Sequence, residues 1–224
     1  MKKIVVFTGA GISAESGIST FRDANGLWEN HDIMDVASIE GWNRNPKLVL
    51  DFYNARRKQL HNVSPNFAHQ YLKDLESNYD VTIITQNVDD LHERVGSSQV
   101  IHLHGELRKA CSEKDKTLVT DWHYDIHYGD LATDGEQLRP FIVWFGEMVP
   151  LMDQAIEETL KADIFLVIGT SLQVYPAASL VDFVPEHAQI ILIDPKASEM
   201  DLKNKIRIIN KSATEGVKEL NLLA

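Results

Sequence analysis

The chain has 224 residues, 44% of them hydrophobic and 25% charged, and its formal net charge at pH 7 is −11. This composition is that of a globular domain with a sizeable core, and the negative charge argues against nucleic-acid binding through phosphate contacts, which need a basic surface. The single cysteine, Cys111, excludes an intramolecular disulfide, and no apolar stretch approaches the length of a membrane span. We expect a cytoplasmic protein with no nucleic-acid or membrane partner.

The first predicted strand, residues 3–7, is a short apolar run that leads into Gly9-Ala10-Gly11. Two glycines one residue apart let a ligand approach the backbone with no Cβ in the way, and with Ala14 they satisfy the G-x-G-x-x-G/A dinucleotide fingerprint. A helix over residues 12–16 would then present unpaired N–H groups to a pyrophosphate. Taken alone, the turn is equally compatible with a tight connection.

Strand and helix patterns alternate along the rest of the chain, although no strand-like run appears between the glycine turn and Val81. Continuous apolar runs, typical of strands buried on both faces, occur at residues 3–7, 81–85, 100–102, 164–168, 189–193 and 206–209. Helical patterns lie at residues 46–60, 65–75, 90–95, 151–161 and 213–222. The alternation predicts a Rossmann-like, doubly wound α/β sheet with a smaller inserted helical module, and ligands bind such sheets outside the carboxyl ends of the strands.

Small or polar residues follow four of the predicted strands, and the segments around them resemble one family. GAGIS, GISTFRD, TQNVDDLHERVG, HLHG, VWFGE, IGTSLQVYPA and SATEGV occur in this order, as in the sirtuins, which are NAD-dependent protein deacylases. The resemblance implies that NAD is consumed with an acylated-lysine protein or peptide to give nicotinamide, free lysine and O-acyl-ADP-ribose. It also implies one catalytic domain, 1–224, with an NAD-binding core (1–29, 78–105 and 141–224) and insertions at about 30–77 and 106–140.

The resemblance assigns catalytic roles to three residues. His104 matches the family's catalytic histidine, and an imidazole suits a general base because it titrates near neutrality. His102 is interpreted as a structural histidine. Asn87 and Asp89 are expected both to surround the nicotinamide end of NAD and to form a turn and helix N-cap, since their side chains suit either role.

NAD contacts are implied along several loops. Phe21 would shield the reactive sugar from water, and Arg22 would orient a phosphate or ribose. Many sirtuins carry Asn where this chain has Asp194, so a backbone contact is as compatible there as a side-chain contact. The implied NAD-binding residues are Gly9, Ala10, Gly11, Ile12, Ser13, Phe21, Arg22, Gln86, Asn87, Asp89, Gly169, Thr170, Ser171, Asp194 and Ala213.

Two features concern the acylated substrate. Val143, Trp144 and Phe145 resemble the segment that pairs as a strand with the substrate backbone, and Val174 belongs to the facing strand, residues 173–176. Tyr53 and Arg56 resemble the Tyr-x-x-Arg of the sirtuin class that removes succinyl and malonyl groups. Positions three apart share a helix face, so a phenol and a guanidinium can converge on one carboxylate, and we expect a preference for acidic acyl groups.

The sequence departs from the family in one module. Most sirtuins hold a structural zinc with two Cys-x-x-Cys pairs between the His-Gly and the V-W-F-G-E segments, but residues 106–140 contain Cys111 alone, so we expect no zinc. A helical segment carrying His123 and His127, with Asp125 or Asp121, stays open as a substitute metal site. Otherwise, packing of Leu118, Trp122, Tyr124, Ile126 and Tyr128 is expected to stabilise the module.

Two other functions stay open at this point. Transfer of ADP-ribose to a protein would share the first bond cleavage but use another acceptor. A non-catalytic, NAD-sensing module would need none of the catalytic side chains, and the presence of His104, Asn87 and Asp89 argues against it. The sequence leaves the oligomeric state unknown.

Overall fold

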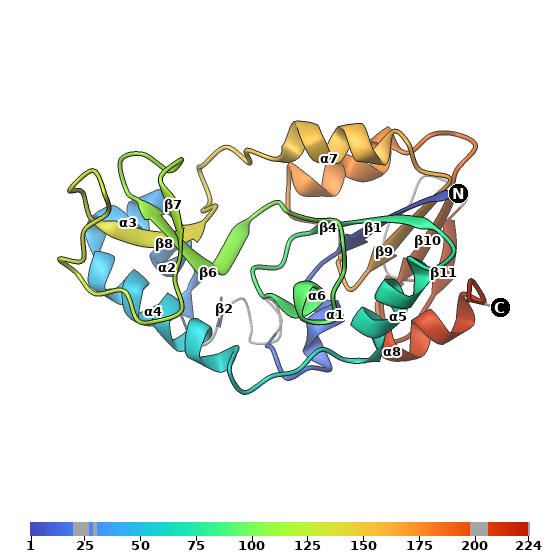
Figure 1. Ribbon diagram of the computed structural model, residues 1–224, viewed down its shortest axis with the longest axis horizontal. Coiled ribbons are helices and arrows are strands. Elements are labelled where there is room, and N and C mark those ends of the chain that lie inside the picture. The colour runs from blue at the N-terminus through green and yellow to red at the C-terminus, as the bar shows by residue number, and fades with distance from the viewer. Residues whose placement is uncertain (20–26, 29–30, 198–205, 224) are drawn as a thin grey trace.

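The computed structural model describes residues 1–19, 27–28, 31–197 and 206–223. The larger of its two lobes holds the parallel sheet and both chain termini (Figure 1). The smaller lobe, at the left of that view, contains α2, α3, α4 and the strands β6, β7 and β8. The elements of the two lobes interleave in sequence, because the chain leaves the larger lobe and returns to it more than once.

The larger lobe is built on a six-stranded, all-parallel sheet in the order β11-β10-β9-β1-β4-β5. The chain crosses from one side of β1 to the other within this order, which creates the topological switch point where α/β sheets bind ligands. All six predicted strands are confirmed: β1 (Lys3–Thr8), β4 (Asp80–Thr85), β5 (Val100–His102), β9 (Ile164–Ile168), β10 (Gln189–Ile193) and β11 (Ile206–Ile209).

Helices cover both faces of this sheet because successive side chains of a strand point to opposite faces. Ile4 and Val6 pack in one cluster with α5 (Phe67–Leu75) and α8 (Ala213–Gly216). Val5 and Phe7 pack in another with α7 (Met152–Thr159) and a 3₁₀ helix (Ala177–Phe183). The remaining elements of this lobe are short: α1 (Gly11–Ala14), α6 (Leu91–Arg94) and a 3₁₀ turn (Val217–Glu219) that replaces the second half of the predicted helix 213–222.

The position of α5 bears on the domain boundaries. The sequence analysis placed residues 65–75 in the first insertion, but Ala68, Leu72 and Leu75 are fully buried in the core cluster of the parallel sheet. The sequence pattern predicts the helix but not that it packs on the parallel sheet, because an apolar helix face carries no information about the element that covers it. We propose that the first insertion ends near residue 63 and that α5 belongs to the NAD-binding core.

The smaller lobe combines helices with an antiparallel sheet that the sequence analysis did not predict. Its helices are α2 (Ile33–Val36), α3 (Ile39–Arg44) and α4 (Pro46–Gln59). Its strands form a hairpin of β2 (Leu27–Trp28) with β3 (His31–Asp32), and a sheet of order β7-β6-β8 from β6 (Gly105–Ser112), β7 (Val119–Asp121) and β8 (Leu138–Ile142). These strands carry Arg139 and Pro140 and lack the long apolar runs of the larger sheet.

The packing predicted for residues 106–140 is correct only in part. Ile126 is fully buried, and Leu118 and Trp122 are half-buried. Tyr124 and Tyr128 are 79% and 71% exposed, so their expected core role is wrong.

In the smaller lobe, buried arginine side chains add specific hydrogen bonds to the apolar core. Arg57 Nε on α4 donates to the Leu107 carbonyl at 2.8 Å, and Arg57 Nη1 donates to Asn54 Oδ1 at 2.8 Å. Asn54 in turn accepts from the Ile126 N–H at 2.9 Å and donates to its carbonyl at 2.9 Å. Through these bonds α4 holds both β6 and the loop before β8.

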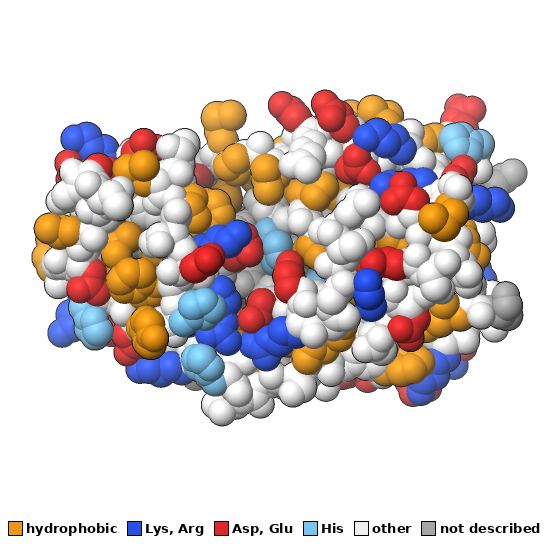
Figure 2. Space-filling model, in the orientation of Figure 1, with side chains coloured by type: hydrophobic (Ala, Val, Ile, Leu, Met, Phe, Trp, Pro, Cys, Tyr) orange, Lys and Arg blue, Asp and Glu red, His pale blue; other side chains and the backbone are white. Residues whose placement is uncertain are grey.

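The surface carries interspersed charges. On the face shown in Figure 2, acidic and basic side chains alternate without a large patch of one sign. None of the described helices has the length and apolar character needed to cross a membrane.

Candidate active site

A cavity of about 510 Å³ is bordered by the carboxyl ends of the parallel strands and by residues of the smaller lobe. Predicted site residues from both lobes line it: Gly9, Ala10, Gly11, Tyr53, Arg56, Gln86, Asn87, Asp89, His104, Val143, Trp144, Phe145, Gly169, Thr170, Ser171, Val174, Asp194 and Ala213. Ile12 and Ser13 do not line it, and Phe21 and Arg22 lie outside the described residues. The cavity thus brings together side chains from one end of the sequence to the other.

The glycine turn after β1 lies directly against the end of β9. The Gly11 N–H donates to the Gly169 carbonyl at 2.8 Å, and a Cβ on Gly11 would lie 2.6 Å from Gly169 Cα. Gly169 has a φ of +65°, a conformation that favours glycine. The glycines are therefore needed for two backbone segments to meet at the floor of the cavity.

One expectation for this turn is wrong. The N–H groups of Gly9, Gly11, Ile12 and Ser13 all donate to protein carbonyl groups at 2.8–3.1 Å, so they are not the unpaired row expected for a pyrophosphate. The helix is short, and β9 supplies acceptors that the local sequence does not reveal. The Ile12 side chain lies in the core, and Ser13 is buried in the polar network described next.

The segment after β4 is held by a chain of hydrogen bonds. Asn87 Nδ2 donates to the Gly9 carbonyl at 3.2 Å and to Ser13 Oγ at 3.1 Å, and Ser13 Oγ donates to Asp89 Oδ2 at 3.0 Å. Both amide hydrogens of Asn87 are engaged, so its side chain offers a ligand only the acceptor oxygen.

Asp89 lines the cavity, where its contact with NAD stays a prediction, and both of its carboxylate oxygens are bonded within the protein. Its Oδ1 accepts from the Leu91 N–H at 3.2 Å at the start of α6, but the N-cap of this helix is Asp90, whose side chain makes no capping bond. Burial raises the pKa of Asp89, although its hydrogen bonds from Leu91 and Ser13 act against this. Through Ser13, the Asp89 carboxylate thus helps to hold the Asn87 side chain in place.

His104 has the protonation state that a general base requires. Its Nδ1 lies 3.1 Å from the Gln86 carbonyl oxygen, which can only accept, so Nδ1 carries the hydrogen and Nε2 keeps its lone pair. Burial lowers the pKa of His104, with the Gln86 bond acting weakly in the opposite direction. The imidazole is therefore neutral at neutral pH and can accept a proton. Gly105, with a φ of +82°, turns the chain into β6 directly after it.

Tyr53 and Arg56 meet the same cavity from α4. Tyr53 is fully buried, and its hydroxyl accepts from Trp144 Nε1 at 3.1 Å. Burial raises the pKa of Tyr53, so the phenol stays protonated and its own hydrogen can be donated.

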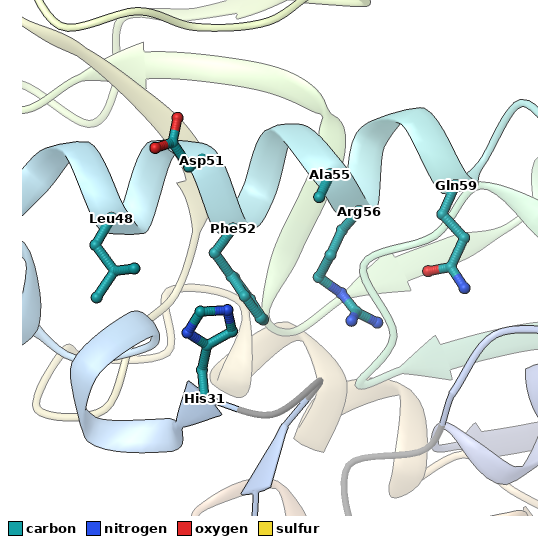
Figure 3. A pocket seen from close by; sticks show the side chains of 7 residues that line it. All are labelled: His31, Leu48, Asp51, Phe52, Ala55, Arg56 and Gln59. Carbon is teal, nitrogen blue, oxygen red and sulfur yellow. The ribbon is translucent and has the colours of Figure 1, made fainter.

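The Arg56 side chain is 6% exposed, with its guanidinium carbon 4.5 Å from the Trp28 ring centroid and 5.6 Å from that of Phe52. Such contacts favour a cation at an aromatic face. Figure 3 shows Arg56 and Phe52 projecting from the same side of α4, with His31 opposite Phe52, around a second cavity of about 380 Å³.

The two segments expected to pair with a substrate backbone are not strands within the chain itself, apart from a parallel bridge between Phe145 and Ser38. Val143 N–H donates to the His104 carbonyl at 2.9 Å, Trp144 N–H to Glu147 Oε2 at 2.9 Å, and Phe145 N–H to the Ala37 carbonyl at 2.8 Å. Residues 173–176 form a bend and a turn that start a 3₁₀ helix. Val143, Trp144, Phe145 and Val174 nevertheless line the cavity.

Several cavity residues were missed by sequence reasoning. Glu147 is 3% exposed and pairs with Arg139 through two contacts of 2.8 and 3.2 Å, while the Arg139 guanidinium carbon lies 3.4 Å from the Trp144 ring centroid. Burial works to raise the pKa of Glu147, but the hydrogen bonds and charge of Arg139, together with the hydrogen bonds from Lys116 and the Trp144 N–H, lower it overall. Glu147 belongs to the predicted VWFGE segment, but nothing in the sequence pairs it with Arg139.

Glu15 is a second missed residue that lines the cavity. Its carboxylate accepts from Ser212 Oγ at 3.0 Å, and from the Thr214 N–H and Oγ1 at 2.9 and 2.6 Å. This ties α1 to the start of α8, beside Ala213. Asp194 Oδ1 accepts from the Lys196 N–H at 2.8 Å, so part of its carboxylate shapes the local turn.

The substitute metal site finds no support in the arrangement of its residues. Residues 122–130 are not helical, and Asp125 Oδ2 instead pairs with Lys58 at 2.7 Å. Among the described residues, no group of three or more His, Cys, Asp or Glu side chains is placed to hold a metal ion. Cys111 is buried in β6, and burial raises the pKa of its thiol to about 11.

Comparison with known proteins gives consistent relatives over the full length. The chain is 59% identical over 220 residues to an NAD-dependent protein deacylase of Helicobacter pylori, covering 98% of this chain and 96% of the relative. It is 56% identical over 230 residues to a protein of the same name from Bacteroides thetaiotaomicron, covering 100% of this chain and 98% of the relative.

Solved structures share the fold. A Sir2 homologue in complex with ADP-ribose has a TM-score of 0.87 at 37% identity, covering 99% of this chain and 90% of its own. A Sir2 homologue in complex with NAD has a TM-score of 0.85 at 38% identity, covering 99% and 88%. The Sir2 family model matches residues 9–176, which include the glycine turn, the Gln86–Asp89 segment and His104. The chain therefore belongs to the Sir2 family.

Proposed function

We propose that this protein removes acyl groups from lysine side chains of proteins, using NAD as a co-substrate that is consumed in the reaction. The observation that carries the proposal is the neutral His104, with its Nε2 lone pair, in a cavity lined by the glycine turn, by Asn87 and by Tyr53. Relatives at 56–59% identity over the full length are NAD-dependent protein deacylases by name. The enzyme is accordingly an NAD-dependent protein deacylase.

The residues of the cavity fit NAD by their chemistry. Bound NAD supplies an electrophilic ribose carbon with nicotinamide as its leaving group. Asn87 offers one acceptor oxygen for a donor such as a carboxamide N–H or a ribose hydroxyl, and His104 Nε2 accepts a proton from a ribose hydroxyl. Gly9 and Gly169 line the cavity and let its two backbone segments pack together, since a Cβ on Gly9 would meet Thr170 and one on Gly169 would meet the backbone of Gly11 and Ile12. Asp194, Ala213 and Ser212 form the opposite end, where we place the adenosine.

The finer part of the proposal is a preference for acidic acyl groups such as succinyl and malonyl. Tyr53 has already accepted the hydrogen of Trp144 Nε1, so its hydroxyl hydrogen is left to donate. Arg56 places a positive charge at the same cavity while packed against Trp28. A protonated phenol and a guanidinium can together bind a carboxylate. A succinyl or malonyl group carries a carboxylate, whereas an acetyl group does not.

A panel of acyl-lysine peptides assayed for nicotinamide release tests this preference. We expect the kcat/KM ratio of succinyl to acetyl peptide to exceed one in the wild type and to fall at least about tenfold in Arg56→Met, since a charged hydrogen bond to a carboxylate contributes about 1.5–3 kcal/mol. Lys58→Met, an exposed cation on the same helix, is the matched control and should leave the ratio unchanged. An unchanged ratio in Arg56→Met would contradict the acidic preference but leave deacylation standing.

ADP-ribosyl transfer to protein is distinguished by its product. Label from the adenosine of NAD would stay on protein in that case, whereas deacylation releases it as O-acyl-ADP-ribose. The acylated-lysine proteins that serve as substrates, and a cytoplasmic location, remain predictions.

A further inference from the structure

Two histidines near the end of β5 hold two successive carbonyl groups of the segment after β4. His104 Nδ1 lies 3.1 Å from the Gln86 carbonyl oxygen, and His102 Nδ1 lies 3.0 Å from that of Asn87. Because a carbonyl oxygen only accepts, each Nδ1 carries a hydrogen. From the sequence, His104 is expected to be catalytic and His102 structural. In the structure both histidines bind the same segment, the one that follows β4.

The second nitrogen of each ring sets the two histidines apart. His104 Nε2 has its lone pair available, as described above. His102 Nε2 lies 2.7 Å from Glu93 Oε1, and an ionised carboxylate also only accepts. Both nitrogens of His102 therefore donate, which makes its ring an imidazolium, although the side chain is only 7% exposed.

The groups around His102 favour its charge. Glu93 on α6 is bonded to it, Glu106 on β6 and Asp89 face it with negative charge, and His92 on α6 is held neutral by burial. Burial works to lower the pKa of His102, but the hydrogen bond and charge of Glu93, with those of its neighbours, raise it overall. His102 therefore keeps its proton to a higher pH than an ordinary histidine, in agreement with the two acceptors that face its ring nitrogens.

We propose that the protonated His102, held by Glu93, is a positioning residue that fixes Asn87 for its contact with NAD. Every polar group of Asn87 except the amide oxygen is then bonded within the protein. Its N–H donates to Thr85 Oγ1 at 3.0 Å, its carbonyl accepts from His102, and its side-chain nitrogen donates to Gly9 and Ser13. A neutral His102 has one hydrogen and must release either Asn87 or Glu93.

The kinetic consequence rests on the proposed function, whereas the charge of His102 and its coupling to Asn87 do not. Two measurements keep them apart. Nitrogen-15 NMR of the histidine rings at about pH 7 reads the charge: we expect both nitrogens of His102 protonated and only Nδ1 of His104. The carbon-13 shift of the Asn87 carbonyl should move with the same midpoint as the His102 titration. The inference would be overturned by a singly protonated His102, or by an Asn87 carbonyl shift that does not change as His102 titrates. Neither result depends on whether the protein releases nicotinamide.

The second measurement is the pH profile of kcat/KM for NAD in nicotinamide release. We expect an alkaline limb that moves to lower pH by about one unit in Glu93→Gln, because the paired charge is lost while an acceptor oxygen remains. His102→Gln should lower kcat/KM by about tenfold, since the charged hydrogen bond to the Asn87 carbonyl is lost, and should remove the limb. Glu106→Gln is the matched control, since this residue faces His102 but bonds to Lys109, and its limb should move less. An unmoved limb in Glu93→Gln would overturn the role, because this conservative change at a half-exposed side chain leaves the core intact.

Discussion

The parallel sheet and the smaller lobe both have an apolar core, but among the described residues the buried arginines belong to the smaller lobe. Phe165, Leu166 and Ile168 in the sheet are 0% exposed, with apolar neighbours on both faces. In the smaller lobe, Arg57 and Arg139 are 1% and 3% exposed. Arg57 donates to the Leu107 carbonyl of β6, whereas Arg139 donates to the Ile142 carbonyl of its own strand and pairs with Glu147. An apolar side chain can be buried against many partners, whereas a buried guanidinium requires particular ones. The smaller lobe, which carries Tyr53 and Arg56, therefore depends on a few specific polar contacts in addition to its apolar core.

The largest effect is expected from breaking the Arg139–Glu147 pair. Arg139→Met leaves Glu147 as a buried charge and frees the Trp144 segment, at a cost of about 3–5 kcal/mol. Amide hydrogen exchange should show the loss in β6 and β8, with β1 and β9 less affected. Lys116→Met removes a 48% exposed partner of the same carboxylate and should cost less than about 1 kcal/mol. Equal losses of exchange protection in the two lobes would contradict a role for Arg139 that is specific to the smaller lobe.

Acid should weaken the larger lobe first, because burial lowers the pKa of His69 to about 4. An unfolded histidine binds its proton near pH 6.5, so this contribution is complete above that pH and is lost as the pH falls toward about 4. We expect unfolding free energy in urea to drop by about 2 kcal/mol between about pH 7.5 and about pH 5 from this residue alone.

His69→Gln is the matching variant, because a glutamine can still accept the Asn66 N–H in the capping box but does not titrate. Its free energy of unfolding should fall less over this pH range than that of the wild type. Glu147 contributes in a lower window, since its lowered pKa means that its stability is lost only as the pH falls below about 4.5. If His69→Gln keeps the full pH dependence, His69 is not its source.

The smallest effect is expected at the Lys58–Asp125 pair, which also links α4 to the loop before β8. Lys58 is 66% exposed, so solvent screens the pair and Lys58→Met should change stability by less than about 1 kcal/mol. Thermal unfolding checks this, and a loss as large as that in Arg139→Met would show that exposed pairs, too, hold the smaller lobe.

The same division explains what the sequence could predict. All six strands of the parallel sheet were found because burial on both faces leaves continuous apolar runs such as Ile164–Ile168. The strands β6, β7 and β8 were missed because they are short, polar or exposed on one face, and β8 contains Arg139 and Pro140. Their order depends on hydrogen bonds from α4, which lies about 50 residues earlier in the chain than Leu107.

For the candidate site, the motifs identified which residues meet but not how they are bonded. Gly9, Asn87, His104 and Gly169 line one cavity, as strand ends in a doubly wound sheet should. The pairing of Gly11 with Gly169, of Tyr53 with Trp144 and of His102 with Glu93 was not predictable, because a spacing in sequence carries no information about a partner elsewhere in the fold. These pairings decide the protonation states on which the chemistry depends.

The central claim is that His104 is the general base of an NAD-dependent deacylase, and one comparison tests it most directly. Nicotinamide release and lysine deacylation are measured together with an acyl-lysine peptide for the wild type, His104→Ala and His123→Ala, a histidine exposed on the smaller lobe. The account predicts that His104→Ala loses deacylation by at least about 100-fold, the usual scale of general-base catalysis, while it still folds and His123→Ala stays near wild type. Deacylation by folded His104→Ala at the wild-type rate would contradict it.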